Sequence, residues 1–506
     1  MKTTMNSMDK LVYRRQFLLA GQHIAGFPDW VRLDITPELK LSVHPELEVE
    51  QYRDGSGSIT LLGFIFDAAR PAATGAEILR ELWALRADPQ VLRRDTDRLG
   101  GRWIIVVQHA GRTWLFNDAT GARHICHARI KGAVVCASQA GLIAEQYPLQ
   151  MDPAALDFVR ARGDSDLDVY WLPGDRTLYR EVRALLPNHV LDLQSGAVVR
   201  DWPGAPLPVL DHATVLARSQ QTLRGFLAAA HRRGGGLSVP MTAGWDSRLV
   251  LAMCQPHAAD LYCYTLIYPN QSRANRDVAV PARLLRKLGL AHDVISYPHT
   301  VDPALRALCR RNNVSGNDAF CADTQILREV YPDGMLCLTG DVAEIVKCHF
   351  RLGPDHTGPV TPADLARLLG MPQHPFALEA LREWQAGVPA DCAIHPLDLL
   401  CWEQMAGRWQ AMIRSEYDVV QESFAPLNCR TLLVEMLTLD ESLRKSPTFL
   451  FFAELIRGLW AETLSEPINP PERVGLKSRV IRAANRFGLQ RLIPPGIKEQ
   501  LRRLMS

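Results

Sequence analysis

The chain has 506 residues, which allows about two to four domains at roughly 150 residues each. Apolar residues make up 47% and charged residues 22%, an ordinary globular composition that excludes disorder of the whole chain. The 57 basic and 55 acidic side chains leave a net charge of +2, so no global field would recruit nucleic acid or an anionic membrane. No apolar run approaches the roughly 18 residues of a membrane-spanning helix. We expect a cytoplasmic protein without nucleic-acid or membrane partners.

The N-terminal part of the sequence is predicted to form mainly short strands. Residues 13–19 resemble a twin-arginine export signal, but the residues that follow lack an apolar core and a small-residue cleavage site. We interpret residues 16–21 as an early strand instead. Residues 109–112 are typical of a hairpin turn, and residues 75–87 have the apolar spacing of a helix. Further strands are predicted at residues 58–66, 103–109, 113–116 and 133–137, so we expect an α+β layered domain.

A proline-rich stretch, residues 202–208, separates this part from a different pattern. We therefore predict two domains, residues 1–203 and 204–506. In the second domain strands alternate with helices, which predicts an α/β fold with a doubly wound parallel sheet. The predicted strands are residues 237–241, 261–268, 293–297 and 335–338, and the predicted helices are residues 213–231, a helix from 246, and 276–288. From residue 363 the pattern indicates a mostly helical extension.

The turn between the first strand and helix of that sheet carries the clearest chemical signal. It consists of Thr242, Ala243, Gly244, Trp245, Asp246 and Ser247. Small residues let backbone N–H groups approach an anion, and the start of a helix adds unsatisfied donors and a positive dipole end. The hydroxyls of Thr242 and Ser247 can donate to phosphate. Asp246 would repel phosphate directly, but it fits a carboxylate that holds Mg²⁺ beside it. An ordinary strand–helix turn with an N-capping Asp is the alternative.

This turn resembles the Ser-Gly-Gly-x-Asp-Ser pyrophosphate loop of N-type ATP pyrophosphatases in the asparagine synthetase family. Residues 338–344, Leu-Thr-Gly-Asp-Val-Ala-Glu, are similar to that family's Ser-Gly-Glu-Gly-x-Asp segment. The match places Gly340 at the glycine of the nucleotide site, Asp341 at the acidic position and Glu344 at the magnesium carboxylate. Val342 replaces a glycine of the family. The resemblance thus implies that Asp246 and Glu344 hold the metal.

Three further matches are looser. Residues 407–416 resemble the family's Asp-Arg-x-x-Met…Glu segment, and residues 424–428 resemble its Pro-Phe-Leu-Asp segment, with Asn428 where Asp is usual. The family has a C-terminal lysine that contacts the departing pyrophosphate. Lys477 is our candidate for it. The alternatives are Lys347, Arg473 and Arg479.

The first domain resembles the class II glutamine amidotransferase domain, on residues 99–123 and on later stretches to residue 189. This resemblance implies an Ntn-hydrolase-like layered β-sandwich, followed by an adenine nucleotide alpha hydrolase-like second domain. Glutaminase chemistry needs an N-terminal cysteine as nucleophile. Here residue 2 is Lys2 and the first cysteine is Cys126. We expect a domain that keeps the fold without hydrolysing glutamine, as in β-lactam synthetases and lasso-peptide cyclases.

The resemblance implies an ATP-dependent carbon–nitrogen ligase. With Mg²⁺ and ATP bound at the turn, a substrate carboxylate would be adenylated, and an amine would then displace AMP. Leu266 would lie beside the adenine, and Asp341 is the nearest candidate for the base. The substrates would be a small molecule or a peptide, with a precursor peptide and its protease as possible partners. An ammonia-using asparagine synthase-like enzyme for an amino acid or sugar acid, and a non-catalytic ATP-binding scaffold, stay open. The basic segment 473–503 could close over the phosphates, dock an acidic partner, or form a solvated helical face.

Overall fold

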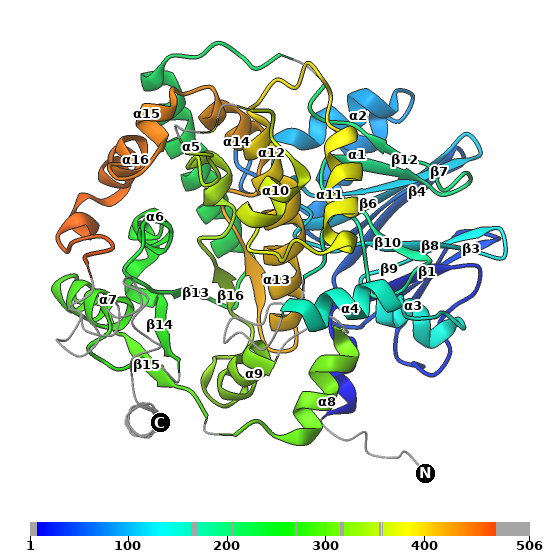
Figure 1. The fold of residues 1–506 in the computed structure, drawn as a ribbon, viewed down its shortest axis with the longest axis horizontal. Helices are drawn as coiled ribbons and strands as arrows, with labels where there is room; N and C mark the ends of the chain where they lie inside the picture. The colour runs from blue at the N-terminus through cyan, green and yellow to red at the C-terminus, as the bar shows by residue number, and fades with distance from the viewer. Residues whose placement is uncertain are drawn as a thin grey trace.

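The computed structural model describes residues 8–162, 171–204, 206–268, 271–298, 300–313, 318–353, 356 and 358–471 (Figure 1). The strands are β1 (Phe17–Ala20), β2 (Val31–Thr36), β3 (Leu39–Val43), β4 (Val49–Asp54), β5 (Gly57–Asp67), β6 (Leu99–His109), β7 (Arg112–Asn117), β8 (Cys126–Ile130), β9 (Ala133–Ala137), β10 (Val182–Ala184), β11 (His189–Asp192), β12 (Val198–Arg200), β13 (Leu237–Pro240), β14 (Tyr262–Ile267), β15 (Asp293–Ser296), β16 (Leu336–Leu338) and β17 (Glu422–Phe424). The α-helices are α1 (Gly75–Ala84), α2 (Pro89–Asp95), α3 (Ala140–Gln146), α4 (Pro153–Arg162), α5 (His212–Arg232), α6 (Trp245–Met253), α7 (Arg276–Lys287), α8 (Pro303–Asn312), α9 (Asp318–Val330), α10 (Pro362–Leu368), α11 (Pro375–Ala386), α12 (Pro396–Leu400), α13 (Ala411–Tyr417), α14 (Arg430–Leu437), α15 (Glu441–Arg444) and α16 (Leu450–Trp460).

Two six-stranded antiparallel sheets form the N-terminal part. Their strand orders are β10-β8-β9-β1-β3-β2 and β12-β11-β7-β6-β5-β4. The predicted strands at residues 16–21, 58–66, 103–109, 113–116 and 133–137 are confirmed as β1, β5, β6, β7 and β9. Ala110 and Gly111 join β6 to β7 with φ of 49° and 76°, the left-handed backbone of a two-residue hairpin turn. The predicted hairpin is therefore also confirmed.

The two antiparallel sheets pack face to face with helices outside them. Leu19 and Leu41 from one sheet meet Leu62 and Ile104 from the other in one buried cluster. Alternate residues of β5 and β6 point outward onto α1 and α2, and the outer face of the β1 sheet is covered by α3. These layers confirm the expected α+β layered β-sandwich.

The first helix is shorter than predicted. A capping box between Thr74 and Glu77 begins α1, which ends at Ala84 rather than at residue 87. Pro89 follows Asp88, whose side chain accepts hydrogen bonds from the first turn of α2. A residue before proline avoids helical backbone, so the chain must leave one helix before it enters the next.

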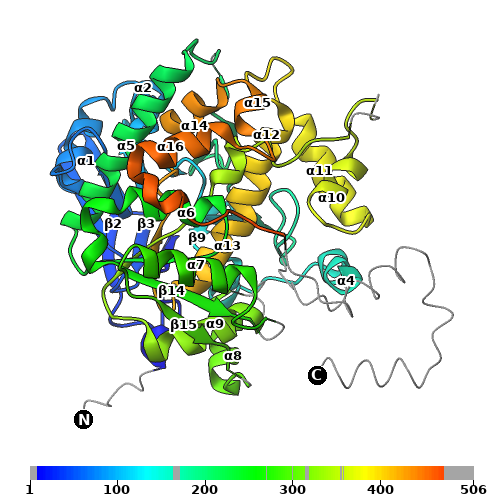
Figure 2. The same ribbon diagram turned by 90° about the vertical axis from the view of Figure 1, so that its left-hand side faces the viewer.

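The C-terminal part contains a five-stranded parallel sheet of order β15-β14-β13-β16-β17. Helices α6 and α7 pack on one face, and α9 and α13 pack on the other. Figure 2 shows α6, α7 and α16 gathered on the same side of β14. The doubly wound parallel sheet is thus confirmed. The helical extension from residue 363 holds for α10–α16 with one correction: β17 joins the sheet through a hydrogen bond from the Thr339 N–H to the Phe424 carbonyl, 2.9 Å.

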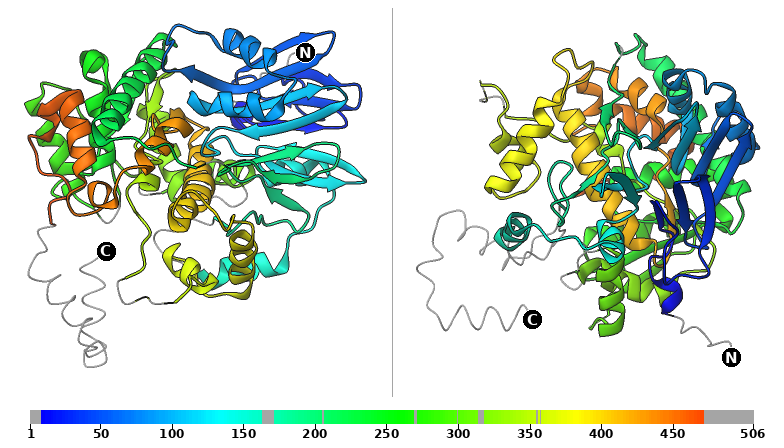
Figure 3. Two further views of the ribbon diagram at one scale, coloured as in Figure 1. Left: turned by 90° about the horizontal axis from the view of Figure 1, so that it is seen from above. Right: turned by 90° about the vertical axis from the view of Figure 1, so that its right-hand side faces the viewer.

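All strands of the antiparallel sheets come from residues 17–200, and all strands of the parallel sheet come from residues 237–424. Figure 3 shows the antiparallel sheets, in blue to cyan, together on one side of the molecule. The strand β17 of the parallel sheet reaches them directly, because the Phe424 ring lies 5.2 Å from the ring of Phe66 on β5. The boundary between residues 203 and 204 stays a prediction. None of the helices in the described ranges has the length and apolarity needed to cross a membrane.

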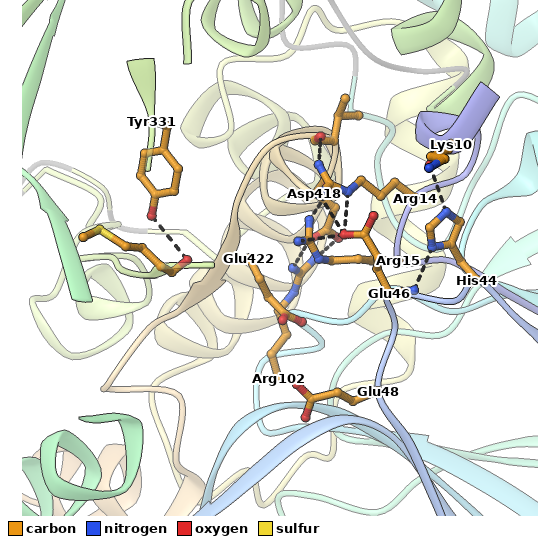
Figure 4. A network of polar contacts seen from close by, with 12 residues as sticks. Lys10, Arg14, Arg15, His44, Glu46, Glu48, Arg102, Tyr331, Asp418 and Glu422 are labelled. Carbon is orange, nitrogen blue, oxygen red and sulfur yellow. Dashed lines mark hydrogen bonds and ion pairs between the residues drawn. The ribbon is translucent and has the colours of Figure 1, made fainter. Parts of the chain in front are cut away.

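Buried ion pairs join the two groups of strands (Figure 4). Arg102 of β6 donates to both carboxylate oxygens of Asp418, at 2.5 and 2.8 Å. Arg14 and Arg15, the two arginines of the export-like motif, donate to the backbone carbonyls of Val419 and Asp418. The arginine pair before β1 therefore holds the N-terminal segment against the chain that follows α13.

Candidate active site

The parallel sheet brings two predicted loops to one edge. From β13 the chain adds β14 and β15 on one side, and β16 and β17 lie on the other. The order reverses between β13 and β16, and open α/β sheets bind ligands in the crevice beyond the carboxyl ends at such a switch point. Residues 242–247 follow β13 and residues 339–344 follow β16. The two segments found by sequence analysis thus flank this crevice.

The turn after β13 is held by its own hydroxyls. The Thr242 and Ser247 oxygens lie 3.1 Å apart, and the Gly244 N–H donates to the Thr242 hydroxyl oxygen at 3.2 Å. Gly244 precedes α6, so the helix begins at Trp245, one residue before the predicted start. The Ala243 N–H donates to Asp277 at 3.1 Å. Phosphate would therefore have to be received by the hydroxyls and by the start of α6 rather than by the Ala243 amide.

Gly340 allows the two loops to touch. A Cβ atom at this position would lie 2.6 Å from Asp246 Cβ and 3.1 Å from the backbone nitrogen of Ser247. Real Cβ atoms do not approach other atoms so closely, so any larger residue would push the loops apart. The next residue but one, Val342, has a φ of 79° and a buried side chain. This left-handed backbone is costly for a β-branched residue, whereas a glycine would adopt it freely.

A lysine lies between the two carboxylates predicted to bind metal. Lys347 Nζ is 2.6 and 2.7 Å from the two Asp246 carboxylate oxygens and 3.6 Å from Glu344 Oε1. Glu344 also accepts a hydrogen bond from Gln410 at 3.1 Å. The structure thus brings Asp246, Glu344 and Gly340 together. It adds Lys347, which sequence analysis had named only as an alternative to Lys477.

The cluster shifts the pKa values of its members. Burial and then the neighbouring Glu344 carboxylate raise the pKa of Asp246 to about 6, although Lys347 opposes the shift. Burial lowers the pKa of Lys347, but Glu344 and Asp246 outweigh it, so the pKa stays above its usual value. Two carboxylates that compete for one ammonium group form a site with excess negative charge.

The predicted base is held in an ion pair. Asp341 accepts a hydrogen bond from the Thr339 hydroxyl at 3.0 Å and lies 3.1 Å from Arg414 Nε on α13. Arg414 is thus a site residue that sequence analysis missed, because nothing in the helical pattern of residues 407–416 marks it. The Asp341 carboxylate is thus held in place from two sides, by a hydroxyl and by a guanidinium.

The carboxylates fit a magnesium ion that is shared with a substrate. Asp246 and Glu344 already contact the same ammonium group, so one cation can reach both. Mg²⁺ is usually bound by one or two carboxylates together with water and substrate phosphates. Within the described ranges no three His, Cys, Asp or Glu side chains gather as a metal site would need. The donor set therefore fits Mg²⁺ that arrives with phosphate, and does not form a cage of protein ligands.

A second polar group lies at the same edge of the sheet. Asp323 of α9 is fully buried and accepts a hydrogen bond from the Tyr417 hydroxyl. Burial raises the pKa of Asp323 to about 6, against hydrogen bonds from Tyr297 and Tyr417. Tyr268 and Tyr297 follow β14 and β15, and their rings lie 5.1 Å apart. Sequence analysis missed these residues. The two strand-end tyrosines were the available signal, whereas Asp323 sits inside a helix and gave none.

Two predicted residues bear less on this geometry. Leu266 lies on β14, opposite Ile295 of β15, and is half-buried on the face that α9 and α13 cover. Its contact with an adenine stays a prediction. Lys477, like Arg473 and Arg479, lies outside the described residues.

No protein-family model matches the chain, and no curated protein matches it. Among solved structures, it is similar to the glutamine phosphoribosylpyrophosphate amidotransferase of B. subtilis complexed with ADP and GMP. The identity is 9%, the alignment covers 76% of this chain and 90% of that one, and the TM-score is 0.21. A structure of the allosteric regulatory enzyme of purine biosynthesis gives 11% identity, 74% coverage of both chains and a TM-score of 0.24. These similarities are too slight to carry an argument about fold or function.

Proposed function

We propose that this chain is an ATP-dependent ligase that adenylates a carboxylate and forms an amide bond with an amine. The observation that carries the proposal is the contact between the loops after β13 and β16 at the switch point of the sheet. This contact brings the Asp246 and Glu344 carboxylates to the same cation, the Lys347 ammonium group. The hydroxyls of Thr242 and Ser247 and the start of α6 lie beside them. Carboxylates for a cation and donors for an anion, side by side, are the set that Mg²⁺–ATP requires.

The residues present would divide the work as follows. Asp246 and Glu344 would hold Mg²⁺, which supplies positive charge to the phosphates. A substrate carboxylate oxygen attacks the α-phosphorus, and pyrophosphate leaves. An amine nitrogen then attacks the acyl carbon, the bond to AMP breaks, and the nitrogen loses a proton. Asp341 remains the candidate for accepting that proton, and Lys477 for contacting the pyrophosphate.

The cysteines support a reaction without glutamine hydrolysis. Cys126 and Cys136, on β8 and β9, are fully buried free thiols. Burial raises the pKa of Cys126 to about 11 and the pKa of Cys136 further still. A nucleophilic cysteine needs a lowered pKa and access to substrate. The amine would therefore be a second group of the substrate, an amine on another molecule such as a peptide, or free ammonia.

One observation favours the non-catalytic scaffold as a second candidate. The Asp246 carboxylate is already satisfied by Lys347 at 2.6 and 2.7 Å, and the Ala243 amide by Asp277. A carboxylate and an amide that already have partners within the chain need no ligand to satisfy them. The two candidates differ in whether ATP is cleaved to pyrophosphate.

The test is exchange of labelled pyrophosphate into ATP with a panel of amino acids, sugar acids and acidic peptides. We expect exchange with at least one carboxylate, and a loss of roughly a hundredfold or more in Asp246→Ala, because a group that stabilises transition-state charge is removed. Asp34→Ala is the matched control, since Asp34 pairs with Lys40 on the distant antiparallel sheet.

Thermal unfolding with Mg²⁺–ATP separates the outcomes. A ligand that binds only the folded chain stabilises it by about 2.7 kcal/mol at a hundred times its Kd. Stabilisation together with exchange supports the ligase. Stabilisation without exchange over the whole panel favours the scaffold. If Mg²⁺–ATP gives no stabilisation and no carboxylate gives exchange, a nucleotide site at this edge of the sheet is excluded.

A further inference from the structure

Lys347 lies outside both segments that resemble known nucleotide sites, residues 242–247 and 338–344. Its ammonium group is nevertheless the cation at the centre of the candidate site. Lys347 follows the short helical turn Ala343–Val346, which carries Glu344. The side chain is 11% exposed, and its Nζ contacts Asp246 and Glu344 on one side. On the other side the rings of Phe449 and Phe452 lie with centroids 6.0 and 5.9 Å from Nζ.

This surrounding suits an ammonium group better than a bare divalent ion. Aromatic faces attract an ammonium through the ring quadrupole, whereas Mg²⁺ demands oxygen ligands at short distance. A divalent ion that used both carboxylates would have to take the place of Lys347 Nζ between them. Removing a buried ammonium from its partners is costly unless it finds another anion. Phosphate oxygens at the start of α6 would be that anion.

The local charge leads to the same conclusion. Asp246, Asp341 and Glu344 contribute three negative charges, and Lys347 and Arg414 contribute two positive ones, which leaves one negative charge. Such a site repels a nucleotide that comes without metal. A divalent ion makes the balance positive only if Lys347 stays in the site, so phosphate would have to be received by the metal and by Lys347 together.

We propose that Lys347 competes with divalent metal for Asp246 and Glu344 and passes to the phosphates when metal and nucleotide bind together. Metal binding would then depend on nucleotide. The transfer to phosphate rests on the proposed function, whereas the competition for the carboxylates does not. Lys347 would be a phosphate-binding residue drawn from a different segment than Lys477.

The test is to measure Mn²⁺ binding to the full chain, with and without α,β-methylene-ATP. The electron paramagnetic resonance signal of free Mn²⁺ reports how much of the ion is bound. Without nucleotide, Lys347→Met should bind Mn²⁺ about tenfold tighter or more than the wild type, because a competing charge-assisted contact is gone. Its affinity for the nucleotide, with Mn²⁺ present, should fall by about the same factor. Lys347→Arg keeps the charge and should resemble the wild type in the Mn²⁺ measurement.

Two further variants secure the result. Lys347→Gln can still donate to Asp246, and it replaces the Met variant if circular dichroism shows that the latter does not fold. Lys40→Met removes a lysine of β3 whose Nζ lies 3.0 Å from the Asp34 carboxylate. It should change neither the Mn²⁺ affinity nor the nucleotide affinity. Unchanged Mn²⁺ affinity in the neutral variants overturns the competition, and unchanged nucleotide affinity overturns the transfer. If the wild type binds no nucleotide even with Mn²⁺, the proposed function fails, while tighter Mn²⁺ binding by the variants still supports the competition.

Discussion

At the scale of single residues, Asn428 shows how the surroundings of a buried side chain can require an amide. It is buried, and its side-chain oxygen accepts from the Thr120 N–H and hydroxyl at 3.0 and 2.9 Å. Its amide nitrogen donates to the Gly101 carbonyl and to Asp118 Oδ1, both at 2.9 Å. An aspartate here would lose both donated bonds and face the Asp118 carboxylate. Only an amide can both donate and accept at this position.

We therefore predict that Asn428→Asp lowers the free energy of unfolding by roughly 3–5 kcal/mol, the cost of an uncompensated buried charge. Urea unfolding at pH 7 measures the change. Asn275→Asp is the matched control: Asn275 caps α7 by accepting from the Asp277 N–H, and aspartate caps equally well. Equal effects of the two substitutions would contradict this account of Asn428.

At the scale of elements, β17 depends on an ion-pair cluster more than on its own three residues. Glu422, at the start of the strand, is buried against Arg123 of the antiparallel part and Arg233 after α5, each at 2.8 Å. Burial opposes the charged form, but the two arginines outweigh it and lower the pKa of Glu422 to about 2. The folded state thus binds the Glu422 proton more weakly than the unfolded chain does.

The lowered pKa of Glu422 sets the direction in which the free energy of unfolding depends on pH. The stabilisation from ionised Glu422 is complete above about pH 4.5, its usual pKa, and is lost as the pH falls through that value toward 2. It amounts to about 3 kcal/mol for a shift of this size. The free energies of unfolding of the wild type and Glu422→Gln should differ most at pH 6–7, and the difference should shrink as the pH falls from 4.5 toward 2. A difference that stays constant between pH 7 and pH 3 would refute the assignment.

At the scale of the whole molecule, buried ion pairs connect the antiparallel sheets to the parallel one. Arg102 and Asp418 are 3% and 4% exposed and bond through both carboxylate oxygens. Breaking one side of such a pair leaves the other charge without a partner, while replacing both sides by apolar groups can be neutral.

We expect Arg102→Met to lower the free energy of unfolding by roughly 3–5 kcal/mol, and Arg102→Met with Asp418→Leu to recover most of it. Calorimetry measures both, and it also shows whether the sheets unfold in one transition. Strictly additive losses in the double variant would mean that the two side chains do not depend on each other.

The sequence by itself determined those strands and helices whose signals lie in neighbouring residues. The apolar run 237–241, the small turn 242–247 and the alternation of strands with helices predicted the parallel sheet and the place of Asp246 just beyond one of its strands. Periodicity and turn residues are local properties, so they can be interpreted before the chain folds. The segment 338–344 was found in the same way, from the strand that precedes it.

Only the tertiary structure decided what those residues face. Lys347 meets Asp246 across 101 positions of the chain, and Arg414 meets Asp341 across 73. The strand β17 is three residues long and exists because β16 offers it a partner, so no local pattern marks it. Asp323 acquires its raised pKa from burial, which outweighs the hydrogen bonds from tyrosines on other elements. Such partners depend on how distant segments pack, and it is this packing that creates the charge balance of the candidate site.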